Sequence, residues 1–126
     1  MAFVLDAALD ALHGYVADNC DRVDLCTAEP ATYAGVAAVS VANYALTLGA
    51  GNGDWTILDG AVSGRSLRLE AQTGSNGTAT GDADFFAGTD GTATLLVTGA
   101  ADGDTVNNGS PANISQSVVL NLPDFT

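Results

Sequence analysis

The chain has 126 residues, of which 47% are apolar and only 14% are charged. Fifteen acidic residues against three arginines and no lysine give a formal charge of −12. A surface this acidic repels phosphate groups, so nucleic acid and anionic membranes are poor direct partners. We expect residues 1–126 to form a single domain, because this length is enough to bury one core.

The first residues carry no targeting signal that we can identify. Met1 to Leu5 lack the basic start of a signal peptide, and Asp6 and Asp10 interrupt any apolar run. No apolar run in the chain approaches the length of a membrane span. We therefore expect the protein to be made, and to fold first, in a cytoplasm.

Residues 5–19 are predicted to form an amphipathic helix. Apolar residues recur there at spacings of three and four: Leu5, Ala8, Leu9, Leu12, Tyr15 and Val16. This stripe is expected to pack on the sheets formed by the rest of the chain. His13 lies outside the stripe, and we expect it at the surface or at its boundary.

Residues 22–122 are predicted to form six or seven short antiparallel strands. The predicted strands cover residues 22–26, 39–48, 54–58, 66–72, 79–87, 92–98 and 114–122, the last ending at Pro123. Residues 22–26 alternate in polarity, which predicts a strand with one wet face. Turns are predicted at residues 59–60, 74–77 and 90–91, and a long polar loop at residues 99–113. Residues 31–38 fit either a helical turn or extended chain. The fold class that follows is a mainly β protein, an antiparallel β-sandwich or small barrel with the N-terminal helix packed on it.

No set of residues predicts catalysis, and we expect a protein that is not an enzyme. His13 and Cys20 are seven residues apart, about two helical turns, which is too far for a hydrogen bond between them. Cys20 and Cys26 are expected to be buried thiols, although a disulfide between them is possible. The glycine-rich segment 49–54 lacks the last glycine of the dinucleotide fingerprint and precedes a predicted strand.

Two acidic pairs are the candidates for a metal site. Asp82 and Asp84, and likewise Asp102 and Asp104, place carboxylates two residues apart, and calcium prefers such oxygen ligands. Neither pair matches an EF-hand loop, and we expect them to be solvated turn residues. No cofactor is predicted.

The opening of the chain resembles a family of small structural proteins of tailed bacteriophages. The resemblance is carried by residues 5–12, LDAALDAL, and 16–34, VADNCDRVDLCTAEPATYA. Residues 45–51, 63–65 and 123–125 extend it along most of the chain. It implies a virion location, most similar to a capsid decoration (cement) protein that binds the outer surface of the major capsid protein as a homo-oligomer and stabilises the head.

Other functions remain as alternatives. A neck or tail component is the second position that the resemblance implies. Docking is expected through the N-terminal segment, the outer face of the helix or the loop 99–113. A carbohydrate- or surface-binding module is the other alternative, with Trp55, Tyr33 and Tyr44 as stacking candidates, although aromatic residues of this kind are more often part of a core.

Overall fold

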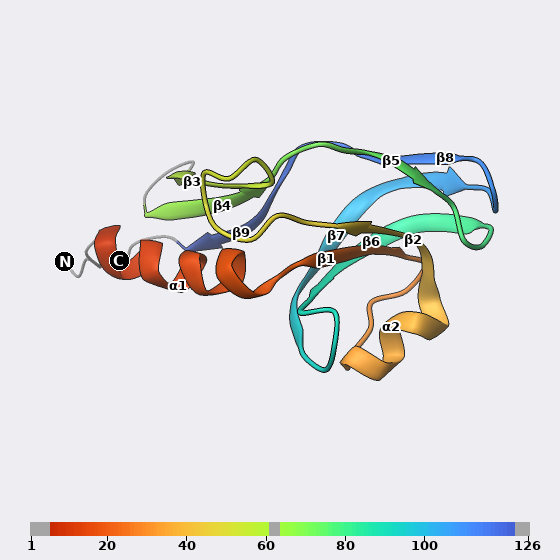
Figure 1. The fold of residues 1–126 in the computed structure, drawn as a ribbon, viewed down its shortest axis with the longest axis horizontal. Coiled ribbons are helices and arrows are strands. Elements are labelled where there is room, and N and C mark those ends of the chain that lie inside the picture. Colours follow the sequence, from red (N-terminus) through yellow and green to blue (C-terminus); the bar gives the residue numbers. More distant parts are fainter. Residues whose placement is uncertain (1–5, 61–63, 123–126) are drawn as a thin grey trace.

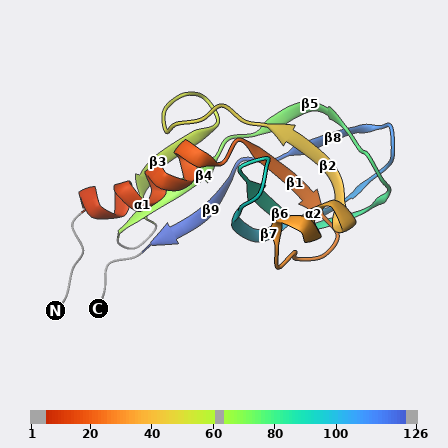
Figure 2. The same ribbon diagram turned by 60° about the horizontal axis from the view of Figure 1, so that its bottom comes forward.

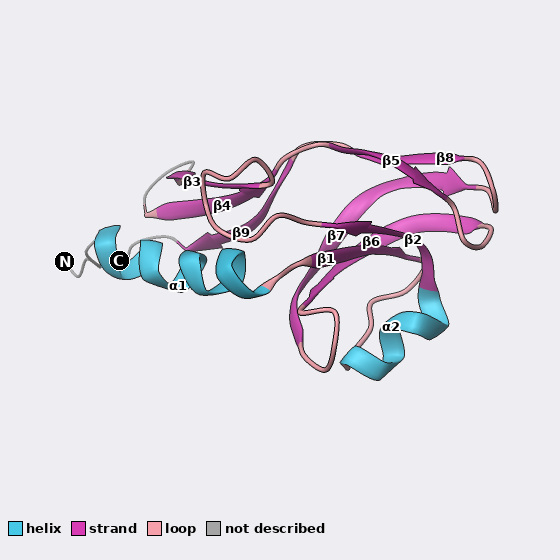
Figure 3. Cartoon of the chain, viewed as in Figure 1, coloured by secondary structure: helices cyan, strands magenta, loops and turns pink. Residues whose placement is uncertain are grey.

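The computed structural model describes residues 6–60 and 64–122 and shows a mainly β protein with two helices (Figures 1 and 3). The elements, in chain order, are α1 (Asp6–Asn19), β1 (Arg22–Cys26), α2 (Tyr33–Val39), β2 (Ser40–Ala45), β3 (Trp55–Asp59), β4 (Arg65–Leu69), β5 (Gln72–Asn76), β6 (Gly81–Thr89), β7 (Leu95–Val106), β8 (Pro111–Ile114) and β9 (Ser117–Leu122). Neither described helix is long and apolar enough to cross a membrane.

The strands form three antiparallel sheets, as the alternating patterns predict. Their orders are β2-β1-β6-β7, β3-β4-β9 and β5-β8. One core joins Leu25 of β1, Phe86 of β6 and Ile114 of β8, so the two-stranded sheet packs over one face of the four-stranded sheet. This arrangement is sandwich-like. The expected fold class, antiparallel β with an N-terminal helix packed on it, is confirmed, and a closed barrel is not formed.

Helix α1 packs on β3 and β4 of the three-stranded sheet (Figures 1 and 2). Its buried side chains are Leu9, His13, Val16 and Ala17. The predicted stripe is therefore partly wrong, because Leu12 is 58% and Tyr15 63% exposed while His13 is fully buried. The His13 imidazole forms a hydrogen bond with a backbone carbonyl of β4. Because of this tertiary contact, the side of the helix that carries His13 is buried, and not its most apolar side. Leu5, the predicted first residue of the stripe, lies outside the described residues.

Helix α2 covers the other face of the four-stranded sheet. The Thr32 hydroxyl caps it by accepting a hydrogen bond from the Gly35 N–H at 3.1 Å, so the ambiguous segment 31–38 is helical from Tyr33. Val36 packs on Cys26 and Ala87 in a second small core. Strand β1 is consequently buried on both faces, and the prediction of one wet face was wrong.

The C-terminal half contains more strand than expected. Nine strands lie within the described ranges, against the six or seven predicted. Strand β7 continues to Val106 through most of the predicted loop, and β5 replaces the predicted turn, with an irregular register around Gly74 at φ +90°. The predicted strand at residues 114–122 is divided into the end of β8 and β9. Pro123, its predicted end, is outside the described residues.

Candidate functional site

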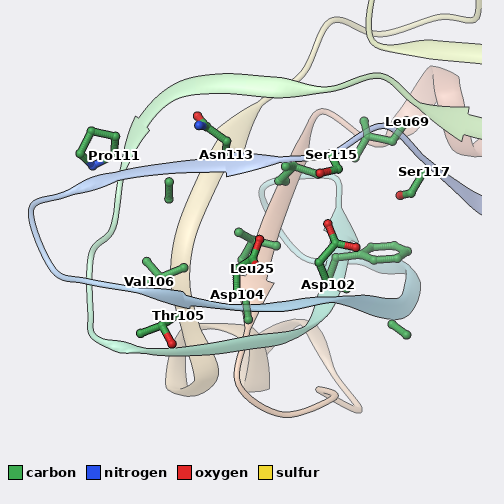
Figure 4. Close-up of a pocket in the computed structure, with 16 residues that line it drawn as sticks. Leu25, Leu69, Asp102, Asp104, Thr105, Val106, Pro111, Asn113, Ser115 and Ser117 are labelled. Carbon is green, nitrogen blue, oxygen red and sulfur yellow. The ribbon is translucent and has the colours of Figure 1, made fainter.

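The four candidate calcium ligands lie on neighbouring strands but not on one surface. Asp82 and Asp84 belong to β6, and Asp102 and Asp104 to β7. Asp82 is opposite Thr105 and accepts a hydrogen bond from its hydroxyl at 2.7 Å. Thr105 points to one face of β7, whereas Asp102 and Asp104 point to the opposite face (Figure 4). Among the described residues, no three histidine, cysteine or acidic side chains are grouped to hold a metal ion.

A groove of about 250 Å³ lies between β7 and the segment formed by β8 and the start of β9 (Figure 4). Its floor is apolar and includes Leu25, Leu69, Phe86 and Ile114. The Phe86 ring lies directly against Gly99, where an added Cβ would collide with it. The absence of a side chain at Gly99 therefore allows Phe86 to form part of the floor.

The rim of the groove is polar and acidic. Asp102 and Asp104, both exposed, line one side, and Asn113, Ser115 and Ser117 line the other. Figure 4 shows both carboxylates directed from β7 into the space between the strands. An apolar floor below two carboxylates suits a ligand that is partly apolar and positively charged.

The groove exists because β7 and β8 do not pair. They are consecutive strands joined only by residues 107–110, a length that usually produces a hairpin. In this chain β8 pairs with β5, and β7 pairs with β6. The connecting loop is held by Gly77, whose N–H donates to the Ser110 carbonyl at 2.8 Å and whose carbonyl accepts from the Gly109 N–H at 2.8 Å. One edge of β7 and one edge of β8 therefore face the groove.

The candidate base, His13, and the two candidate nucleophiles, Cys20 and Cys26, lie in separate environments. His13 Nε2 is 2.9 Å from the Arg65 carbonyl oxygen, and its Nδ1 is buried without a hydrogen-bond partner in the described structure. Cys20 and Cys26 are free and buried, as expected. Burial raises the pKa of the Cys20 thiol to about 12 and that of Cys26 to about 11. Thiols this basic are poor nucleophiles at neutral pH. The expectation that His13 lies at the surface or at its boundary was wrong, because the side chain is fully buried.

The aromatic candidates for carbohydrate stacking are largely interior. Trp55 is 1% exposed and donates from its indole nitrogen to the Cys20 carbonyl at 3.2 Å. Tyr44 is 3% exposed, and its hydroxyl donates to the Ala112 carbonyl. Tyr33 is half-buried at the start of α2. The rings of Trp55 and Tyr44 therefore present no face to a sugar.

Helix α1 presents a second candidate surface, which we call the α1 outer face. Its residues are all exposed and lie opposite the side packed on the sheet: Ala8, Ala11, Leu12 and Tyr15. The sequence places these residues on the helix but gives no sign that they face solvent, because the helix has apolar residues on both sides. The groove was missed for a different reason, since residues 99–113 were predicted to be a loop.

Comparison of the chain with protein-family models, with curated proteins and with solved structures gave no match.

Proposed function

We propose that the chain is a non-enzymatic structural protein of a bacteriophage virion. It decorates the capsid as a homo-oligomer, binds the outer surface of the major capsid protein and stabilises the head. The α1 outer face is the observation that carries this proposal. Leu12 and Tyr15, 58% and 63% exposed, project from the side of a helix whose other side is already packed. Exposed apolar side chains grouped on a rigid element suit a protein–protein contact.

The charge distribution supports a partner with a basic surface around an apolar centre. All three arginine side chains are used in internal ion pairs, Arg22 with Asp24, Arg65 with Asp10 and Asp59, and Arg68 with Glu70. The side-chain charges left without an opposite partner are therefore carboxylates. Complementary charge would guide docking, and repetition over a symmetric shell would strengthen a weak single contact.

A cryo-EM reconstruction of the assembled particle tests the position. Regular density for this chain on the outside of the shell supports decoration, density confined to the neck or tail supports the second position, and no regular density anywhere overturns the proposal.

Co-sedimentation with capsid shells that lack the chain tests the docking surface. Leu12→Asp is expected to abolish binding, because it places a carboxylate in the apolar contact. Ala38→Asp is the matched control, since Ala38 is exposed on α2 and receives the same charge. Equal binding by both variants and the parent would show that the α1 outer face does not dock.

A further inference from the structure

We infer that the groove between β7 and β8 binds an extended, positively charged segment of a partner protein, which adds as a strand to the edge of β7. This surface is separate from the α1 outer face, and the inference does not depend on the proposed function. It rests on three features: the unpaired strand edges, the apolar floor and the two carboxylates of the rim.

The backbone supplies the first feature. Strand β7 is the last strand of its sheet and runs over Leu95–Val106, with a bulge at residues 101–103, where its register with β6 shifts. Only β6 pairs with it in the described part of the chain, so the N–H and C=O groups of its other edge have no strand partner there. Such an edge is a template for an added strand, and main-chain hydrogen bonds then supply much of the affinity.

The side chains supply the second feature. In an added strand, alternate side chains point to the same face. One set would enter the groove, where Phe86 and Leu25 offer apolar contact within a space of about 250 Å³. A short segment with apolar residues at alternate positions therefore matches the groove better than a helix.

Charge supplies the third feature and selects the occupant. Asp102 and Asp104 line the rim, and both are exposed. Lysine or arginine beside them would form ion pairs at the mouth of the groove. A second copy of this chain is a poor occupant, because it has no lysine and each of its three arginines is already ion-paired.

The test uses the full chain and a fluorescent, end-blocked peptide of alternating lysine and valine. Binding is followed by fluorescence anisotropy, and the contacted residues are identified from backbone amide NMR shifts. We expect the shifted amides to cluster in β7 and β8. Methylation of the peptide nitrogens along one edge keeps its charge but removes its main-chain donors, and it is expected to weaken binding by more than about tenfold. Equal binding by the methylated peptide would overturn strand addition.

Two double variants separate the groove from the general acidity of the surface. Asp102→Asn with Asp104→Asn removes both rim charges and is expected to weaken binding about tenfold at low salt. Asp82→Asn with Asp84→Asn removes the same charge from neighbouring positions that do not line the groove, and it is expected to change binding less than about twofold. Equal weakening in both variants, or NMR shifts centred on α1, would overturn the inference. Melting curves establish that both variants fold.

Discussion

His13 on α1 donates a hydrogen bond from Nε2 to the carbonyl oxygen of Arg65, the first residue of β4, at 2.9 Å. A carbonyl oxygen can only accept, so Nε2 carries the proton. The Arg65 side chain returns to the same helix and donates to the Asp10 carboxylate at 2.8 Å. Main chain and side chain of one strand residue are thus both bound to α1, which explains why the helix turns its histidine inward.

His13→Ala is expected to destabilise the domain by about 2–4 kcal/mol. The substitution leaves a cavity in a fully buried position and removes the donor to the Arg65 carbonyl. Urea unfolding followed by the fluorescence of Trp55, the only tryptophan and a buried one, measures the change. Leu12→Ala is the control on the exposed side of the same helix. A loss no larger than that of the control would contradict the docking of His13.

Leu9→Asp and Leu12→Asp are expected to differ sharply in stability, although both put a carboxylate on α1. Leu9 is 4% exposed and belongs to the buried side, whereas Leu12 is 58% exposed. A charge buried without a partner should cost about 4 kcal/mol or more, while the exposed substitution should stay within about 0.5 kcal/mol. Thermal melting of the two variants measures this difference. Similar melting temperatures would mean that α1 is not docked on its own sheet in solution.

The same helix illustrates how far the sequence could predict this fold. The existence of α1 and of most strands followed from local periodicity, which depends on residues close together in the chain. The buried side of α1 did not follow, because it depends on a contact between His13 and Arg65, 52 residues apart. Asp24 is a similar case: its carboxylate is fully buried because Arg22 and the Ser40 hydroxyl bind it. The burial of His13 has no local pattern, and that of Asp24 depends in part on Ser40, which is distant in the sequence.

The groove was harder to predict from the sequence than the buried side of α1. Residues 99–106 are rich in glycine and aspartate, which have low strand propensity, yet residues 99–100 and 104–106 pair along one edge with β6. The groove forms because β8 pairs with β5 and not with β7. Choices among partner strands depend on the whole chain. Asp102 and Asp104 were therefore identified as a pair in sequence, but their place on a groove was not.

The two thiols are expected to be unreactive in the folded protein. Cys20 and Cys26 are buried, and burial raises the pKa of each, to about 12 and about 11. Ellman's reagent should therefore label neither thiol in the native state and both in denaturant. The time course at intermediate denaturant should follow unfolding, as reported by Trp55. Rapid labelling of the native protein would show that one thiol is accessible.

Asp90 is expected to make stability depend on pH in the acidic range. Its Oδ1 accepts hydrogen bonds from the backbone N–H groups of Thr92, Ala93 and Thr94 at 2.9, 2.9 and 3.0 Å. These donors hold the pKa of the carboxyl well below its ordinary value. A group whose pKa is lower in the folded state than in the unfolded state stabilises the fold above the unfolded value, about 3.9. That contribution is lost as the pH falls through the folded pKa.

Asp90→Asn should therefore lower the melting temperature at pH 6 and lower it progressively less as the pH falls below about 4. Asparagine keeps one acceptor oxygen but never carries the charge that strengthens the three hydrogen bonds, so the difference from the parent must shrink once Asp90 begins to protonate. Melting curves of parent and variant across this range measure the difference directly. Asp102→Asn is the control, since it removes an exposed carboxylate on β7, outside the turn that Asp90 begins. A difference in melting temperature between the parent and Asp90→Asn that stays constant with pH would mean that the carboxylate charge does not stabilise the turn.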